Sequence, residues 1–222
     1  MAELGVFAKY WAPGKVKTRL AARLGADLAA DVYRILLQHL VGQLTRLSIR
    51  RTLVFSPAES LEAFSRVFPV DWHFAPQATG DLGERLSHFA KQALARDAEQ
   101  KVILIGSDTP RLGPDQIQQA VEELDRFPVV LGPTADGGYY LIGLRRVGTV
   151  FDRIPWSTPE VWNATLQRLQ TERLPYHALA PMNDVDDAED LDQLIQELTD
   201  SMNPADRRLL TDLLTLLKRE TQ

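Results

Sequence analysis

The run Lys101–Ile105 constrains the fold more than any other part of this sequence. Four aliphatic residues in a row, Val102 to Ile105, follow Lys101, as is typical of a strand buried on both faces at the centre of a parallel sheet. Other short β-branched runs alternate with longer stretches in which apolar residues recur at helical spacing. This alternation predicts an α/β fold, a three-layer α/β/α sandwich around a mainly parallel mixed sheet.

The same two periodicities give the individual elements. Strands are expected at Leu4–Lys9, Arg51–Phe55, Trp72–Pro76, Lys101–Ile105, Val129–Gly132, Tyr139–Leu144 (a candidate for antiparallel pairing) and Tyr176–Leu179. Helices are expected over Leu20–Leu47 with a break near Gly25, and over Leu61–Phe68, Glu84–Arg96, Gln116–Arg126, Glu160–Glu172 and Glu189–Leu198. Thr158-Pro159 is the expected cap and first residue of the helix at Glu160. We assign residues 1–200 to one domain and residues 201–222 to a helical extension.

The extension is an amphipathic helix over Pro204–Glu220, with Asn203 as its cap and Pro204 in its first turn. A wide apolar face is formed by Leu209, Leu210, Leu213, Leu214, Leu216 and Leu217. A face of this width has to be buried. The sequence leaves two alternatives open, packing on its own domain or a homodimer contact.

Composition excludes several classes of protein. The 222 residues include no cysteine, which excludes a disulfide framework, a thiolate metal centre and a cysteine nucleophile. A formal charge of −5 argues against a general nucleic-acid binder. No run of about 18 apolar residues and no secretory leader pattern is found, so we expect a cytoplasmic protein without a membrane span.

A basic loop follows the first expected strand. The stretch from Leu4 to Ala26 contains no acidic residue, although the protein is acidic overall. Its cations are Lys9, Lys15, Lys17, Arg19 and Arg23. Pro13-Gly14 makes a turn, after which Lys15, Lys17 and Arg19 can project toward one point beside a helix start, where phosphate is the natural counter-charge. The alternative is a solvated basic loop.

The spacing of this loop excludes two common phosphate-binding motifs. In a Walker A loop the Gly-Lys pair is followed directly by Ser or Thr, whereas Gly14-Lys15 is followed by Val16. The Gly-x-Gly-x-x-Gly turn of dinucleotide-binding folds is absent from the first strand–helix junction. The sequence therefore predicts a phosphate loop of another kind.

Carboxylates follow the central strand and precede the Glu189 helix. Asp108 comes directly after the strand, in Gly106-Ser107-Asp108-Thr109-Pro110. It is therefore expected at the carboxyl edge of the sheet, where ligands bind in open α/β folds. The alternative is that its carboxylate only accepts hydrogen bonds from the amides of its own turn. In Asn183-Asp184-Val185-Asp186-Asp187, Asp184 and Asp186 are two residues apart and point the same way if extended, with Val185 pointing into the core. Two such carboxylates suit Mg²⁺. Helix capping by Asp186 or Asp187 is the alternative.

Three further segments are candidates for ligand contacts. Gln77–Arg85 is a glycine-bearing turn that suits a nucleobase, with a plain helix cap at Asp81 as the alternative. Asp136-Gly137-Gly138-Tyr139-Tyr140 suggests a backbone shaped to admit a ligand, or a hairpin turn. Pro155–Pro159 is a candidate for an acceptor pocket.

Taken together, these segments resemble a bacterial family of GT-A-type transferases, whose members are usually labelled glycosyltransferases and some of which occur in arsenosugar-linked gene clusters. More distantly, they are similar to the phospholactate and phosphoenolpyruvate guanylyltransferases. The resemblance covers residues 4–198. It is carried by Phe7-Ala8-Lys9, Pro13 to Leu20, Gly80 to Arg85, Gly106 to Pro110, Asp136 to Tyr140, Trp156-Ser157-Thr158 and Asp184-Val185-Asp186.

The resemblance implies the nucleotide-diphospho-sugar transferase fold, a divalent metal (Mg²⁺ or Mn²⁺) and a nucleotide over the first half of the sheet. Asp108, Asp184 and Asp186 would hold the metal, and Asp108, Lys17, Arg19 and Asp136 would be catalytic. The nucleotide and its phosphates are assigned to Lys9, Pro13, Gly14, Lys15, Lys17, Arg19, Gln77, Gly80, Asp81, Leu82, Gly83 and Ser107. The small-molecule acceptor is assigned to Asp136, Gly137, Gly138, Tyr139, Tyr140, Trp156, Ser157 and Thr158.

The resemblance leaves two reactions open, because this fold supports both. In glycosyl transfer an acceptor attacks the anomeric carbon of a nucleotide-sugar and a nucleoside diphosphate leaves. In nucleotidyl transfer a phosphate or carboxylate attacks the α-phosphorus of a nucleoside triphosphate and pyrophosphate leaves. Glycosyl transfer is our first expectation, with Asp136 as general base for a hydroxyl acceptor. A nucleotide-binding protein without catalytic activity is a third alternative.

Overall fold

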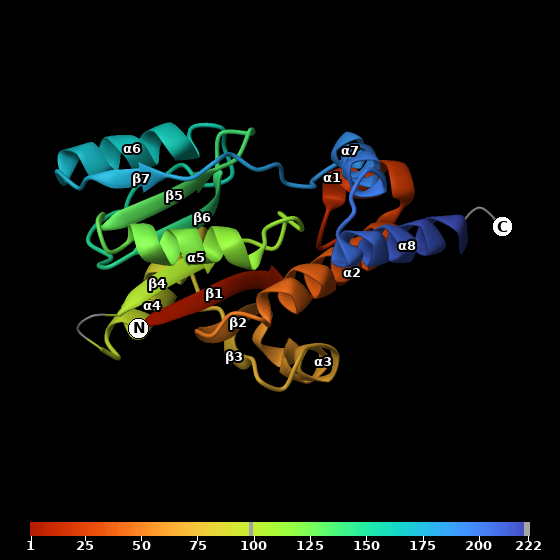
Figure 1. Ribbon diagram of the computed structural model, residues 1–222, viewed down its shortest axis with the longest axis horizontal. Helices are drawn as coiled ribbons and strands as arrows, with labels where there is room; N and C mark the ends of the chain where they lie inside the picture. Colours follow the sequence, from red (N-terminus) through yellow and green to blue (C-terminus); the bar gives the residue numbers. More distant parts are fainter. Residues whose placement is uncertain (98–99, 220–222) are drawn as a thin grey trace.

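A seven-stranded mixed sheet forms the centre of the protein (Figure 1). The computed structural model describes residues 1–97 and 100–219. The strands are β1 (Ala2–Lys9), β2 (Arg50–Ser56), β3 (His73–Pro76), β4 (Lys101–Ile105), β5 (Val129–Pro133), β6 (Tyr139–Leu144) and β7 (Tyr176–Ala178). Their order is β3-β2-β1-β4-β6-β5-β7. Only β6 runs against its neighbours among these strands, which confirms the mainly parallel mixed sheet and the antiparallel pairing of Tyr139–Leu144.

Helices cover both faces of the sheet, which confirms the three-layer sandwich. The helices are α1 (Thr18–Leu24), α2 (Ala26–Leu44), the 3₁₀ turn η1 (Ala58–Ser60), α3 (Leu61–Val67), α4 (Leu82–Leu94), α5 (Pro114–Glu123), α6 (Val161–Thr171), α7 (Ala188–Thr199) and α8 (Pro204–Arg219). Side chains from α2, α3 and α5 share one hydrophobic core with the sheet, and those from α4 and α6 share the other. The predicted break at Gly25 separates α1 from α2, as expected.

The side chains of β1 are divided between the hydrophobic cores on the two faces of the sheet. Leu4, Val6 and Ala8 belong to the core under α2 and α5, whereas Phe7 belongs to the core under α4. β1 pairs in parallel with β2 on one side and β4 on the other. The chain therefore reverses its winding direction between β1 and β4. In open α/β sheets this switch point, at the carboxyl ends of the strands, is where ligands bind.

Helices α1, α2, α7 and α8 pack together beyond the carboxyl end of β1, on the right of Figure 1. Leu209 and Leu213 of α8 are buried against α2 and α7, which confirms the packing of this helix on its own chain. The Asn203 side-chain oxygen accepts a hydrogen bond of 2.9 Å from the Ala205 amide, so the predicted cap is also confirmed. The homodimer contact stays a prediction.

The start of α6 differs from the prediction. The helix begins at Val161 instead of Glu160, and Thr158 is not its cap. The Thr158 hydroxyl donates to the Pro155 carbonyl (2.7 Å), and the Thr158 carbonyl accepts from the Val161 amide (3.3 Å). The same hydroxyl also accepts from the Glu160 amide (3.3 Å), but Glu160 precedes the first helical residue and itself takes the N-cap position, so these bonds form a turn before the helix.

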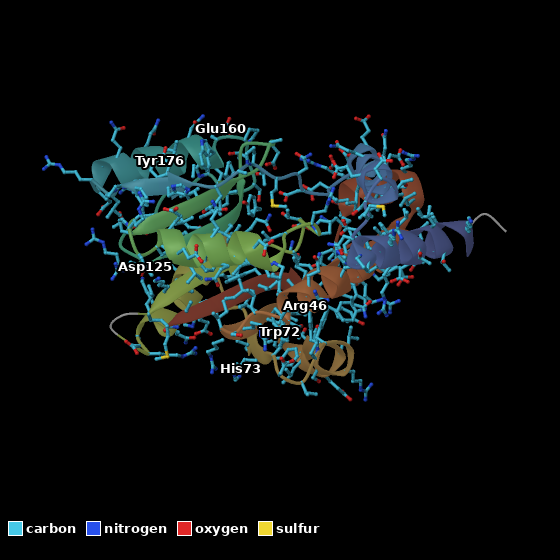
Figure 2. The ribbon with its side chains drawn as sticks, in the orientation of Figure 1. Arg46, Trp72, His73, Asp125, Glu160 and Tyr176 are labelled. Atoms are coloured by element: carbon cyan, nitrogen blue, oxygen red, sulfur yellow. The ribbon has the colours of Figure 1, made fainter. Side chains whose placement is uncertain are left out.

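Ion pairs occupy the amino edge of the sheet. Glu3 on β1 is fully buried, accepts from the Thr52 hydroxyl (2.8 Å) and pairs with Arg50 and Arg96. Lys101 at the start of β4 pairs with Asp125 (2.7 Å), which Figure 2 labels at the end of the sheet opposite α1 and α7. None of the described helices is both long enough and apolar enough to cross a membrane.

Candidate active site

A crevice with two halves opens at the switch point between β1 and β4. One half has a volume of about 560 Å³ and is lined by the cations Lys9, Lys15, Lys17, Arg19 and Arg85; we call it the basic half. The other, of about 520 Å³, is lined by Asp108, Asp136, Asp184 and Asp186 with several aromatic side chains; we call it the acidic half. Arg19, Asp108 and Asp186 line both. The predicted basic loop and the predicted carboxylates therefore meet in one crevice.

Lys17 joins the two halves. It lies at the start of α1 with a left-handed backbone (φ 46°), a conformation that non-glycine residues adopt mainly at constrained and functional positions. Its ammonium donates to the carboxylates of Asp108 and Asp186, the latter at 2.9 Å, and its side chain is only 3% exposed. Burial opposes the charge on Lys17, but the two carboxylates outweigh it and raise the pKa of the ammonium. Lys17 is therefore a buried cation held between carboxylates from two distant segments.

Tyr33 on α2 ties the loops after β1 and β4 to each other. Its hydroxyl accepts a hydrogen bond from the Lys9 amide (3.0 Å) and shares another with the Ser107 hydroxyl (2.9 Å). Burial raises the pKa of Tyr33 to about 12, so the phenol stays protonated. Tyr33 is not among the predicted site residues, because a single tyrosine on the apolar face of a helix carries no signal that separates it from an ordinary core residue.

The segment after β7 brings its aspartates to the loop after β4. The Val185 amide donates to the Asp108 carbonyl (2.9 Å), and the Val185 side chain is buried, as predicted. The Asp184 carboxylate accepts from the Thr109 hydroxyl. Burial raises the pKa of Asp184 to about 7, with nearby carboxylates adding to the rise and the Thr109 hydrogen bond opposing it. Asp184 and Asp186 thus face the same crevice.

Asp187 has a different task from its neighbours. Its carboxylate accepts from the Glu189 and Asp190 amides at 2.9 and 3.1 Å and caps α7. The expected capping alternative is therefore confirmed for Asp187. The carboxylate of Asp186 instead pairs with Lys17, so capping and a place in the crevice are divided between adjacent residues.

The carboxylates of the acidic half suit a hard divalent cation. No group of three acidic or histidine side chains is gathered closely enough to hold a metal in the part of the chain that the structure describes. Asp108, Asp184 and Asp186 nevertheless line one cavity, and the Lys17 ammonium already stands between two of them. Carboxylate oxygens are the ligands that Mg²⁺ and Mn²⁺ prefer, so the donor set fits the predicted metal.

The turn before α4 is built around Gln77 and Asp81. The Gln77 amide group donates to the carbonyls of Ala8 (3.1 Å) and Val54 (3.0 Å), and its oxygen accepts from Arg85 (3.1 Å). Gln77 lines the basic half, but its side chain is already fixed by the ends of β1 and β2. Asp81 forms a capping box with Glu84 at the start of α4, which confirms the helix-cap alternative.

Aromatic residues form one wall of the acidic half. Tyr139, Tyr140, Trp156, Ser157 and Thr158 line it, as does Asp136. The Trp156 ring lies edge-on to Tyr139, with 6.3 Å between centroids. The Asp136 carboxylate accepts from the Thr134 hydroxyl (2.5 Å) and the Gly138 amide (3.1 Å), which fixes it in its turn.

Most of the predicted site residues line the crevice, and a few only support it. The residues that line neither half are Pro13, Gly14, Gly80, Asp81, Gly83 and Gly137. Gly83 lies in the first turn of α4, and the others lie in the loops and turns that carry lining residues. Leu82, Gly138 and Ser107, in contrast, do line the crevice.

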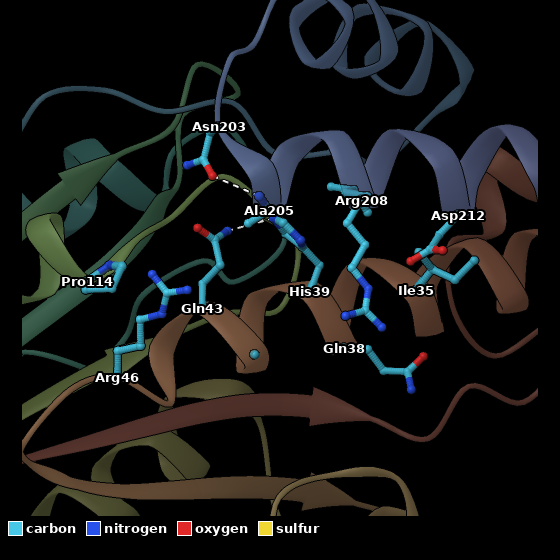
Figure 3. Close-up of a pocket in the computed structure, with 12 residues that line it drawn as sticks. Ile35, Gln38, His39, Gln43, Arg46, Pro114, Asn203, Ala205, Arg208 and Asp212 are labelled. Carbon is cyan, nitrogen blue, oxygen red and sulfur yellow. Dashed lines mark hydrogen bonds between the residues drawn. The ribbon is translucent and has the colours of Figure 1, made fainter.

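A separate cavity of about 470 Å³ lies between α2 and α8 (Figure 3). Figure 3 shows His39 and Gln43 of α2 facing the start of α8, near Asn203 and Arg208. The side chains of His39 and Gln43 are bonded to each other (2.7 Å), and burial lowers the pKa of His39. None of the predicted site residues lines this cavity, so it is not the candidate active site.

Comparison with solved structures supports the fold and the family. A protein from Desulfovibrio desulfuricans G20, provisionally described as a nucleotide-diphospho-sugar transferase, is 33% identical over 98% of this chain and 97% of its own, with a TM-score of 0.88. CMP:2-keto-3-deoxy-manno-octonic acid synthetase in complex with CTP is 12% identical over 89% of this chain and 98% of its own, with a TM-score of 0.57. A cytidylyltransferase from Leptospira borgpetersenii is 11% identical over 99% of this chain and 94% of its own, also with a TM-score of 0.57.

The last two likenesses show the shared fold alone, whereas the first also shows common ancestry. No curated protein matches the sequence significantly. The fold is thus shared with proteins described as a nucleotide-diphospho-sugar transferase, a CMP-sugar synthetase and a cytidylyltransferase. The expected link to arsenosugar clusters stays a prediction. A family profile matches residues 40–158. The chain belongs to DUF2064, the family described as an uncharacterized protein conserved in bacteria.

Proposed function

We propose that this protein transfers a glycosyl group from a nucleotide-sugar to a hydroxyl group of a small acceptor. The observation that carries the proposal is the single crevice in which a wall of cations meets a wall of carboxylates. A nucleotide diphosphate between them would be neutralised from both sides, by side chains and by a metal. The description of the 33% identical Desulfovibrio protein as a nucleotide-diphospho-sugar transferase supports this class.

The basic half suits the phosphates of the donor. Lys15, Lys17 and Arg19 line it together. In glycosyl transfer negative charge develops on the leaving diphosphate, and cations that are already in position stabilise that charge without reorganisation. Mg²⁺ or Mn²⁺, held by Asp108 and Asp186 with Asp184 beside them, would supply further neutralisation of the same oxygens. The leaving group would thus be held at the junction of the two halves.

The acidic half suits an uncharged acceptor. Of the described residues that line it, Arg19, at the junction, is the only Lys or Arg, whereas four are aspartates. Phe7, Leu86 and Trp156 give it an apolar wall. A phosphate or carboxylate on the acceptor would find few partners here, but a hydroxyl compound with an apolar face would fit. Asp136 is the candidate base for the hydroxyl proton.

Nucleotidyl transfer is the second candidate, and the number of cations in the basic half favours it. Among the described residues, five Lys and Arg side chains line that half, and a triphosphate carries more negative charge than a diphosphate. The acidic half favours glycosyl transfer instead, because a nucleotidyl acceptor carries an anionic phosphate or carboxylate. The two reactions differ in their products, which makes them separable.

Product analysis tests the proposed reaction. The protein is incubated with Mg²⁺, mixed nucleotide-sugars and nucleoside triphosphates, and a mixture of hydroxyl compounds, and the products are identified by mass spectrometry. Release of a nucleoside diphosphate with a glycosylated acceptor is the expected result. Release of pyrophosphate would establish nucleotidyl transfer instead, and nucleotide binding without turnover of any donor would contradict both reactions.

A Trp156→Ala variant tests the acceptor half. We expect the KM for the acceptor to rise roughly five- to thirty-fold, equivalent to the loss of about 1–2 kcal/mol of aromatic contact, while the KM for the donor stays the same. Steady-state kinetics with each substrate varied in turn will measure both constants. Trp156→Phe is the matched control and should keep most of the affinity. A rise confined to the donor KM would mean that Trp156 serves the other half.

A further inference from the structure

We propose that, before nucleotide binds, Lys17 occupies the position of the divalent cation between Asp108 and Asp186, so that the metal binds tightly only after a phosphate has drawn Lys17 away. The inference rests on the proposed nucleotide and metal site. It adds to that site a coupling: the binding of the metal and the binding of the nucleotide depend on each other through the Lys17 side chain.

The contacts of Lys17 are the first support. The ammonium bonds one oxygen of Asp108 and one oxygen of Asp186 and is almost fully buried. The two carboxylates are 43% and 41% exposed, so they remain open toward the crevice. A metal that approached them from the crevice would meet a positive charge already bound to the same two groups. Like charges at such short range repel strongly.

The position of Lys17 in the chain is the second support. Its backbone is fixed at the start of α1, while its four-carbon side chain has several rotatable bonds and three donors. Lys17 also lines the basic half, so a phosphate there is an alternative partner for the ammonium. A change of side-chain rotamer exchanges carboxylate for phosphate without movement of the helix. Among the described residues, Lys15 and Arg19 have no ion pair in the structure, so Lys17 alone of the three is engaged in this way.

The exchange implies coupled binding. A phosphate that takes Lys17 frees two carboxylates for the metal, and a metal that takes the carboxylates frees Lys17 for a phosphate. By linkage, each ligand raises the affinity of the other by the same factor. Removing the ammonium should therefore have opposite effects on the two ligands, strengthening metal binding and weakening phosphate binding. A lysine that bound only phosphate, away from the carboxylates, would give at most a small rise in metal affinity when removed, because its charge would be screened.

The test compares the wild-type protein with a Lys17→Met variant. Mn²⁺ alone is titrated and followed by electron paramagnetic resonance of the free ion, and inorganic pyrophosphate alone is titrated in EDTA by calorimetry. We expect the Mn²⁺ affinity of the variant to rise about tenfold or more and its pyrophosphate affinity to fall about tenfold or more. Lys17→Arg, which keeps the charge, should stay near the wild type in Mn²⁺ affinity.

Arg23→Met is the matched control for loss of one positive charge from α1. Arg23 lies in the last turn of α1, the helix that Lys17 precedes, and pairs with Asp192 (2.7 Å), with both side chains more than half exposed. This variant should change neither affinity by more than about twofold, because exposed charges are screened. If it raised Mn²⁺ affinity as much as Lys17→Met does, a general field effect would replace the proposed competition.

The remaining outcomes separate the inference from the proposed function. Unchanged Mn²⁺ affinity in a Lys17→Met variant that has lost pyrophosphate binding overturns the inference and leaves the phosphate site standing. Failure of both proteins to bind Mn²⁺, together with no pyrophosphate binding to the wild type, overturns the proposed function and the inference with it. If Lys17→Met does not fold in EDTA, Lys17→Gln takes its place, and stabilisation by Mn²⁺ in thermal unfolding that exceeds that of the wild type supports the competition.

Discussion

An Asp108→Asn variant should lose turnover by about a thousandfold while remaining folded. Asp108 lies directly after β4, at the junction of both halves of the crevice, and its carboxylate faces Lys17. The substitution keeps the shape of the side chain but removes one of the charges that would hold the metal. Metal ions supply several kcal/mol of charge stabilisation in reactions with a phosphate leaving group, and about 4 kcal/mol corresponds to a factor of a thousand.

The fold should tolerate this change, because an amide oxygen can still accept from the Lys17 ammonium, Asp186 still pairs with it, and the backbone bond of Asp108 is untouched. The Asp108 carbonyl accepts from the Val185 amide, and an asparagine preserves that bond. Kinetics under saturating donor and calorimetry of nucleotide binding in the presence of Mg²⁺ will measure the loss, and circular dichroism will check the fold. Asp192→Asn, at the exposed pair with Arg23, is the matched control and should keep full activity. Metal-dependent nucleotide affinity equal to that of the wild type would show that Asp108 is not a metal ligand.

The sheet and its layers could be predicted because burial dictates the residue pattern of each strand. The run Val102 to Ile105 lies at the centre of the sheet with both faces covered. The amphipathic stretches became helices on the two faces, and Gly25 separated two of them, as its place in the pattern indicated. The start of α6 could not be predicted. Thr158-Pro159 has the sequence of an ordinary helix cap, but the Thr158 hydroxyl bonds the Pro155 carbonyl and the Glu160 amide within a turn, and Glu160 takes the N-cap position.

The site could be predicted as a set of segments but not as a set of contacts. The period-two spacing of Asp184 and Asp186 placed Val185 in the core and both carboxylates in the crevice. What the spacing could not give is the pairing of Lys17 with Asp108 and Asp186, which lie 91 and 169 residues away in the sequence. That pairing depends on the strand order, which no local pattern encodes. Tyr33 could not be predicted for the same reason. Its hydroxyl bonds Lys9 and Ser107 only because α2 crosses the ends of β1 and β4.

A Gly137→Ala variant should be destabilised by about 3–5 kcal/mol and should bind the acceptor poorly. Gly137 has φ +91°, and a Cβ there would lie 2.2 Å from the Pro159 carbonyl oxygen. Its own carbonyl accepts from the Trp162 amide (2.8 Å), so the turn and residues 159–162 are tightly joined. A disfavoured backbone conformation costs about 1–3 kcal/mol, and an overlap that shifts backbone costs about as much again. The displaced segment carries Ser157 and Thr158, which line the acidic half.

Gly25→Ala separates these two costs. Gly25 has a similar φ of +84°, but nothing lies within 4 Å of the position its Cβ would take. This variant should therefore lose only the conformational part, about 1–3 kcal/mol, and keep the acceptor KM of the wild type. Thermal unfolding should show a drop of about 10 °C for Gly137→Ala, since a kcal/mol is worth about 2–4 °C in a chain of this size, and a clearly smaller drop for Gly25→Ala. Equal drops, with an unchanged acceptor KM in Gly137→Ala, would mean that Pro159 yields to the added methyl group and that the turn does not hold the acceptor wall in place.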